Sequence, residues 1–156
     1  MKFRSFPIVV DNSVFLRASA DKSNDFKLKL NLEEQVFRQN IWGINIHNVA
    51  ISHKRTASPK ILRLTCNQIK KIFNLAPNVS QQNEDSDEQT LEVLYLEATR
   101  AVRKNVYKSF RRNHIFVINE PKSTLEFHFR DLLGKDASKF IYPRYCWIHF
   151  SFVKLS

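Results

Sequence analysis

The last third of the chain, residues 123–156, contains two segments in which apolar and polar side chains alternate. The first reads L-E-F-H-F-R at residues 125–130, and the second reads I-H-F-S-F at residues 148–152. Successive side chains of a strand point to opposite faces, so each segment predicts a strand with one buried and one solvated face. Gly134, one of only two glycines in the chain, follows the first segment and indicates a backbone position that excludes a side chain. We therefore expect two long antiparallel strands with an aromatic inner face.

Three earlier segments repeat this alternation: F-K-L-K-L at residues 26–30, W-G-I-N-I-H at residues 42–47 and I-L-R-L-T-C at residues 61–66. After residue 47 the apolar positions continue through residues 49–51 with a shift of one residue, which predicts a β-bulge. The continuous apolar run I-F-V-I at residues 115–118 predicts a strand covered on both faces.

Residues 91–107 fit two patterns. Leu91, Leu94, Tyr95 and Ala98 follow a helical stripe with Asp87 as a candidate N-cap, whereas Leu91, Val93 and Tyr95 also alternate as in a strand. The local pattern favours the helix and the strand-rich surroundings favour the strand, which is the interpretation we adopt. Residues 68–75 suggest a short helical turn, and the polar residues 76–87 a loop. Together, these strand-like segments predict a single all-β domain over residues 1–156. Its architecture is expected to be an antiparallel sandwich or barrel of about seven to nine strands.

The formal net charge is +10 and the isoelectric point is about 9.8. This balance favours an anionic partner, either nucleic acid, acidic lipid or an acidic protein surface. No run of eighteen apolar residues is present, so we expect no membrane span, and the N-terminus lacks the pattern of a signal peptide. Without secretion, Cys66 and Cys146 are expected to be buried free thiols.

Catalytic and metal-binding patterns are absent from the sequence. We find no nucleophile elbow, phosphate-binding loop or dinucleotide fingerprint, so we expect neither an enzyme nor a cofactor. The histidines lack the spacing of metal ligands, and His128 and His149 fall on the solvent-facing positions of their strands. The acidic residues 84–88 are expected to form a solvated loop.

The strongest charge feature is a basic run at residues 100–112 without an acidic residue. It can neutralise phosphates, with Tyr107 and Phe110 stacking on bases. It can equally be a solvated loop, or a surface that contacts an acidic neighbour. The candidate interface residues of this run are Arg100, Arg103, Lys104, Lys108, Arg111 and Arg112.

Four motifs together resemble the penton (minor capsid) proteins of Polinton/Maverick elements, adintoviruses and virophages. F-K-L-K-L followed by W-G-I-N-I-H-N-V-A-I, which begins at Trp42, is similar to the two opening strands of that family. L-R-L-T-C-N, ending in Cys66 and Asn67, resembles the next strand. E-F-H-F-R-D-L-L-G, with Arg130, Asp131 and Gly134, resembles the family's I-x-I-x-I-R-D-x-x-G segment, and residues 148–154 its closing strand. Gly43 departs from the family, which often has an acidic residue there.

The resemblance implies a single eight-stranded antiparallel jelly roll that forms homopentamers at the vertices of an icosahedral virion. The implied partner is a double jelly-roll major capsid protein, with possible non-specific contact to packaged nucleic acid and an intracellular stage before assembly. The alternative interpretation of the residues is a basic nucleic-acid-binding β-barrel.

Overall fold

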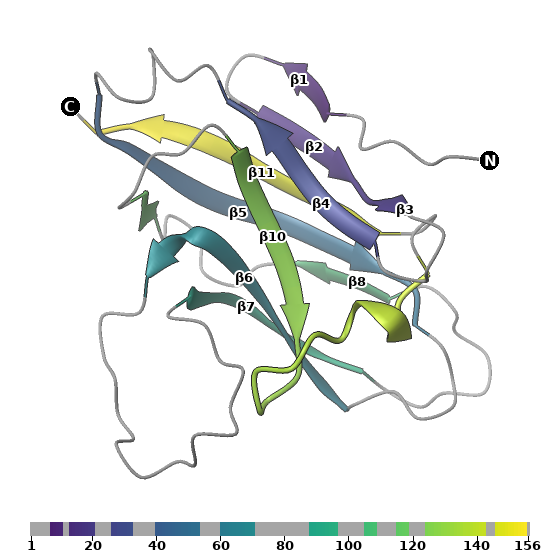
Figure 1. The fold of residues 1–156 in the computed structure, drawn as a ribbon. Helices are drawn as coiled ribbons and strands as arrows, with labels where there is room; N and C mark the ends of the chain where they lie inside the picture. Colours follow the sequence, from purple (N-terminus) through teal and green to yellow (C-terminus); the bar gives the residue numbers. More distant parts are fainter. Residues whose placement is uncertain are drawn as a thin grey trace, which may run out of the picture.

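A computed structural model describes residues 7–10, 13–20, 26–32, 40–53, 60–70, 88–96, 105–108, 115–118, 124–142 and 146–155. These residues form two antiparallel β-sheets and one short 3₁₀ helix (Figure 1). Within the ranges named above, no helix is long and apolar enough to cross a membrane.

The first sheet has the strand order β1-β2-β11-β5-β8, with β9 also paired to β5. Every pairing in it is antiparallel. Its strands are β1 (Pro7–Val10), β2 (Ser13–Arg17), β5 (Trp42–Ile51), β8 (Asn105–Lys108), β9 (Phe116–Val117) and β11 (Trp147–Lys154).

The second sheet has the order β3-β4-β10-β6-β7, again entirely antiparallel. Its strands are β3 (Ser19–Ala20), β4 (Phe26–Asn31), β6 (Ile61–Lys70), β7 (Glu88–Tyr95) and β10 (Thr124–Arg130), and the 3₁₀ helix η1 (Ser138–Phe140) follows β10. The chain passes from the first sheet to the second at the buried Ala18, whose amide donates to the Cys146 carbonyl at 3.3 Å.

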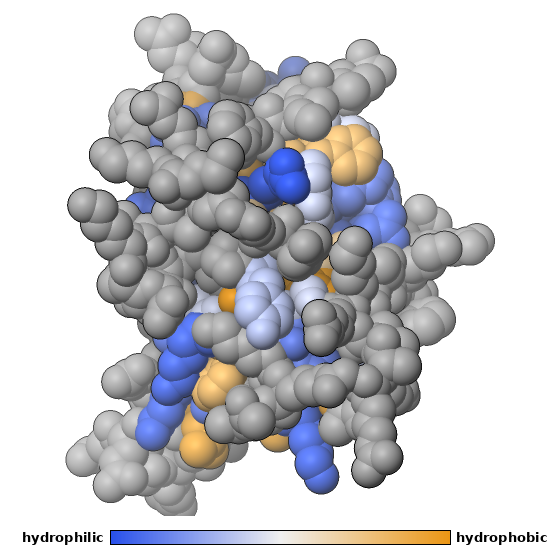
Figure 2. Space-filling view, turned by 90° about the vertical axis from the view of Figure 1, so that its right-hand side faces the viewer, coloured by the Kyte–Doolittle hydropathy of each residue, from blue (hydrophilic) through white to orange (hydrophobic). Residues whose placement is uncertain are grey.

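The core lies between the two sheets and follows from the alternation in the sequence. In β10 the buried residues are Leu125, Phe127 and Phe129, and the intervening residues are half-exposed. Ile148 and Phe150 of β11 are fully buried on the facing sheet, and the rings of Phe127 and Phe150 are 5.1 Å apart. The predicted aromatic inner face is therefore confirmed. Among the coloured residues of the face seen in Figure 2, hydrophilic and hydrophobic residues lie beside one another.

A register shift between β5 and β11 confirms the predicted bulge. His149 pairs with Asn48 and Phe150 pairs with Ile46, so β5 has one additional residue at this point. The extra residue restores the inward direction of the apolar side chains. Ile44 and Ile46 before the bulge, and Val49 and Ile51 after it, are consequently all buried.

Several expectations need correction. The residues that the structure describes contain eleven strands, more than expected, because β1, β3 and β9 are short additions at sheet edges. Residues 68–70 belong to β6 and form no helical turn, since β6 continues to Lys70. Residues 115–118 are not covered on both faces, because Val117 is 43% exposed. The strand interpretation of residues 91–107 is confirmed for the two segments described, which lie in β7 and β8.

The two glycines occupy positions where a side chain is excluded for different reasons. Gly134 has φ of 86°, in the left-handed region that strains other residues, which confirms its expected role. Gly43 lies under the side chains of a neighbouring strand segment. A Cβ atom at Gly43 would collide with Cγ2 of Ile115 and would lie 3.4 Å from Cδ1 of Leu155.

We predict that Gly43→Ala lowers the free energy of unfolding by about 1–3 kcal/mol, because the added methyl overpacks this contact. Replacing Ile115 as well, in Gly43→Ala/Ile115→Ala, removes the colliding group and should reduce the loss caused by the alanine at position 43. Urea unfolding of the four proteins in this double-mutant cycle measures the coupling. A loss at position 43 that is the same with and without Ile115 contradicts the assigned contact.

Candidate functional site

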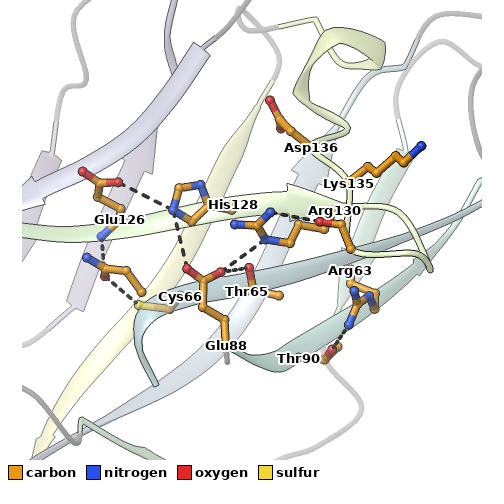
Figure 3. A network of polar contacts seen from close by, with 12 residues as sticks. Arg63, Thr65, Cys66, Glu88, Thr90, Glu126, His128, Arg130, Lys135 and Asp136 are labelled. Atoms are coloured by element: carbon orange, nitrogen blue, oxygen red, sulfur yellow. Dashed lines mark hydrogen bonds and ion pairs between the residues drawn. The ribbon is translucent and has the colours of Figure 1, made fainter. Parts of the chain in front are cut away.

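A network of polar side chains covers the outer face of the second sheet, where β7, β6 and β10 lie side by side (Figure 3). The alternation that buries Leu125, Phe127 and Phe129 directs Glu126, His128 and Arg130 to the opposite face of β10. β6 and β7 add further polar groups, namely Arg63, Thr65, Glu88 and Thr90. The network therefore joins the outer residues of three strands.

Glu88 lies at the centre of this network. Its Oε2 accepts a 2.6 Å hydrogen bond from the hydroxyl of Thr65, which is completely buried. The same oxygen is 3.3 Å from Nε of Arg130, and the two side chains are only 11% and 14% exposed. A carboxylate with this little access to solvent depends on such partners to offset the cost of its burial. Glu88 thus connects β7 to β10 across the intervening strand.

His128 lies between two carboxylates. Its Nε2 is 3.8 Å from Oε1 of Glu88 and 3.6 Å from Oε2 of Glu126, and Glu126 also pairs with Nζ of Lys29 at 2.9 Å. Burial lowers the pKa of His128, and the carboxylates of Glu88 and Glu126 offset this effect only in part. The imidazole is therefore neutral at pH 7.

The segment Arg130-Asp131-Leu132-Leu133-Gly134 forms a tight turn after β10. Oδ1 of Asp131 accepts hydrogen bonds from the amides of Leu133 and Lys135, both at 2.9 Å. The guanidinium of Arg130 donates to the Gly134 carbonyl at 3.0 Å. Side chain and backbone therefore fix this turn together, and Arg130 links it to Glu88.

Cys66 and Asn67 join β6 to the beginning of β10. The Asn67 amide group accepts a bond from the Glu126 amide at 3.0 Å and donates to the Thr124 carbonyl at 3.2 Å. Burial raises the pKa of the Cys66 thiol to about 12, so it is protonated at pH 7 and is not a nucleophile. Burial likewise raises the pKa of Cys146, and both residues are free thiols as expected.

Of the motif residues selected from the sequence, five belong to the second sheet or to the turn that follows it, at two separate places. Cys66 and Asn67 of β6 lie beside the beginning of β10, whereas Arg130, Asp131 and Gly134 lie at its end and in the turn after it. Trp42 lies apart from them, at the start of β5 in the first sheet. Its ring packs edge-on against Phe152 at a centroid distance of 6.4 Å. Arg100, Arg103, Lys104, Arg111 and Arg112 lie outside the described residues. Lys108 is placed only by its backbone, which pairs with Asn48.

Sequence reasoning missed Glu88 and misjudged His128. Glu88 was assigned to a solvated acidic loop, but it begins β7 and is buried. His128 does face outward, as expected, yet its side chain is only 31% exposed and belongs to the network. The available signal was the pattern Glu-x-His-x-Arg at residues 126–130, which puts three ionisable side chains on one face of a strand.

The outer face of the first sheet has a different character. The rings of Phe15 and His149 stack at 4.0 Å, and His47 lies 4.7 Å from His149. Burial lowers the pKa of His149, with a further contribution from His47. Next to them the Arg17 guanidinium lies 4.2 Å above the Trp147 ring, a cation–π contact.

The contacts within the polar network compensate its charges and connect its strands. Glu88 is compensated by Arg130 and Glu126 by Lys29, and the neutral His128 separates the two carboxylates. Among the residues that the structure describes, no group of three or more histidine, cysteine or acidic side chains is placed to hold a metal ion. The network locks β7, β6 and β10 together and orients the turn after β10.

No protein family, curated protein or solved structure that we compared with this chain matches it.

We predict that Glu88→Ala lowers the free energy of unfolding by about 3 kcal/mol, because it removes the hydrogen-bond acceptor of the buried Thr65 hydroxyl and the carboxylate partner of Arg130. The matched control is Glu126→Gln, whose ion pair with the 39% exposed Lys29 is solvated and worth under about 1 kcal/mol. Urea unfolding at pH 7 measures both variants. Equal losses would mean that Glu88 is not the centre of the network.

The lowered pKa of His128 predicts a specific pH dependence. Below the ordinary histidine value of 6.5 the unfolded chain binds a proton that the folded chain binds only at lower pH, so the free energy of unfolding falls as the pH is lowered. His128→Gln should reduce this slope between pH 7 and pH 5. His149 contributes a slope of the same sign, so the variant flattens the curve without abolishing it. An unchanged slope in His128→Gln would contradict the assignment.

Proposed function

We propose that this chain is a single jelly-roll capsid subunit of the penton, or minor capsid, type. The observation that carries the proposal is the strand order. When the short strands β1, β3 and β9 are set aside, the remaining eight strands, numbered along the chain, have the orders 1-8-3-6 and 2-7-4-5. This arrangement is the one expected of an eight-stranded jelly roll, in which each connection crosses between the sheets or closes a hairpin.

The filled interior supports a structural role over a ligand-binding one. Jelly rolls serve as capsid subunits, lectins and cupins, and cupins bind their ligands or metals between the sheets. In this chain that space holds packed side chains, because Phe129 and Phe150 are among the largest fully buried residues and extend from opposite sheets. The residues of the interior therefore serve to pack the two sheets against each other.

The resemblance to penton proteins gains support from the turn after β10. Arg130, Asp131 and Gly134, which carry the motif R-D-x-x-G, each have a separate task in that turn. These tasks give a physical reason for the residue spacing of R-D-x-x-G, which this chain shares with the family that it resembles. The proposal extends to homopentamers at icosahedral vertices, set among double jelly-roll major capsid proteins.

The basic run at residues 100–112 has a role in this proposal as a contact with acidic groups of a neighbouring subunit or of the major capsid protein. β8 lies within this run and ties it to the sandwich, since the backbone of Lys108 pairs with Asn48 of β5. Arg103 and Lys104 are the residues we select to test it.

The purified chain is predicted to form five-fold rings visible by negative-stain microscopy. In cells that also make the major capsid protein, Arg103→Glu/Lys104→Glu should remain folded but should be lost from the particles, because the acidic contact becomes repulsive. The fold is checked by circular dichroism and incorporation by immunoblotting of purified particles. Particles with normal amounts of the variant would refute the charge contact, and a protein without rings at any concentration would refute the pentamer.

A nucleic-acid-binding β-barrel is the second candidate, favoured by the net charge of +10 and the aromatic residues within the basic run. Binding to arbitrary duplex and single strands, titrated with salt, separates the two. A nucleic-acid binder should lose affinity steeply as salt increases, in proportion to the number of phosphates neutralised. A penton subunit should instead sediment as a discrete pentamer without nucleic acid.

A further inference from the structure

Two histidines are in contact on the outer face of the first sheet. The ring centroids of His47 in β5 and His149 in β11 are 4.7 Å apart, and Nε2 of His47 shares a 2.8 Å hydrogen bond with Oγ of Ser151. The ring of Phe15 in β2 stacks on His149 at a centroid distance of 4.0 Å. These contacts run across β2, β11 and β5, which are neighbours in the sheet (Figure 1). Both imidazoles are therefore held in place before any ligand arrives.

The strands around this histidine pair contain basic but no acidic side chains. The six strands of the first sheet, as the structure describes them, hold no aspartate and no glutamate, whereas Glu88, Glu92 and Glu126 lie on strands of the second sheet. The ionisable residues of the first-sheet strands are Arg17, His47, Tyr107, Lys108, His149 and Lys154. A proton added to the pair therefore meets no carboxylate on its own strand or on the strands beside it.

His128 on the second sheet has the opposite environment. Its Nε2 is 3.8 Å from Glu88 and 3.6 Å from Glu126, so a proton on this ring is compensated within the protein. Within the described residues, the contacts of the His149 ring are with the rings of Phe15 and His47. Burial lowers the pKa of His149, and the charge of His47 lowers it further. An anion from solution is the group that can compensate the first-sheet pair.

Protonation turns this pair into a group of hydrogen-bond donors. An imidazolium donates from both ring nitrogens, and the Ser151 hydroxyl can donate as well. Arg17 pairs in register with Trp147, which shares a strand face with His149, and its guanidinium lies 4.2 Å from the centre of the Trp147 ring. Several donors and positive charges without a carboxylate suit a compact oxyanion with several acceptor oxygens.

We propose that His47, His149 and Ser151 form a binding site for a phosphate-type oxyanion, which is occupied when the two histidines are protonated. The proton and the anion are coupled in both directions, because each increases the affinity of the protein for the other. Arg17 adds attraction at every pH, since a guanidinium stays charged. The ligand is inorganic phosphate or the phosphate of a monoester. This inference does not depend on the proposed capsid role.

Sulfate is the first probe, because it has no proton to exchange between pH 7 and pH 5 and any pH dependence then belongs to the protein. NMR follows the ring C–H signals of each histidine in the wild-type chain, with the ionic strength kept constant by sodium chloride. Sulfate should shift the titration of His47 and His149 to higher pH and leave that of His128 unchanged. Its affinity should be at least about 10-fold higher at pH 5 than at pH 7.

The double variant His47→Gln/His149→Gln removes both imidazoles without changing the charge of the neutral protein. Its affinity for sulfate should differ by less than about 2-fold between pH 5 and pH 7. The matched control is His128→Gln, which removes the histidine that lies between carboxylates and should keep the wild-type pH dependence. Arg17→Gln should weaken sulfate binding by a similar factor at both pH values. Circular dichroism checks that each variant is folded.

Inorganic phosphate and phenyl phosphate then distinguish the two sources of the ligand. Equal affinities support a site for the inorganic ion, and tighter binding of phenyl phosphate supports a monoester whose ring contacts Phe15 or Trp147.

Four results would overturn the site. Sulfate that binds equally at pH 7 and pH 5, or that shifts His128 as much as His149, is an adventitious ion only. A wild type that binds no sulfate at pH 5, or a double variant that keeps the pH-dependent binding, also contradicts the proposal. None of these results depends on whether the chain forms pentamers, so the proposed function is tested separately.

Discussion

The packing of β10 against β11 is the interaction on which the rest of the structure depends. β10 lies between β4 and β6 in the second sheet, and β11 lies between β2 and β5 in the first, so each is an inner strand of its sheet. The contact between Phe127 and Phe150 therefore ties together strands from both ends of the chain. Each of these buried aromatic side chains removes a large apolar area from water and adds to the burial of the surrounding leucine, isoleucine and valine side chains.

The same geometry makes the outer face of the second sheet a polar structure in its own right. Directing Phe127 and Phe129 inward obliges Glu126, His128 and Arg130 to point outward, where they meet Glu88 and Thr65. Desolvation would make such a group of ionisable side chains costly, so each has a partner. The result is a second set of connections between β7, β6 and β10, added to the backbone ladder.

The alternation of apolar and polar residues with period two predicted the strands that have one buried and one solvated face. It succeeded because successive side chains of a strand point to opposite faces. β4, β5, β6, β10 and β11 each carry at least five residues of alternating character, and even the bulge in β5 was visible as a one-residue shift of the apolar positions. The two-residue strands β3 and β9 are too short to have a period. Their pairing is decided by the neighbouring strands and not by local sequence.

The polar network was less accessible from the sequence because its members are distant along the chain. Glu88 reaches Thr65 across 23 positions and Arg130 across 42, and the order of the strands in the second sheet is what brings them together. The acidic residues that precede Glu88 favoured a solvated loop, and composition alone contains no signal that the last of them begins a strand. Arg130, Asp131 and Gly134 were identifiable because a turn is a local structure.

The network also affects how the chain can meet other molecules. Glu88 and Glu126 are two of only fifteen acidic residues. Within the second sheet, Glu88 pairs with Arg130 and Glu126 pairs with Lys29. They are therefore not available to balance basic residues elsewhere, and the remaining surface keeps its excess of positive charge. An association between copies of such a chain has to outweigh this repulsion, either through apolar burial or through contact with acidic groups. The turn held by Arg130 and Asp131 presents Leu132 and Leu133 at the surface, so the internal pairing of charge and the exposure of apolar side chains arise from the same few residues.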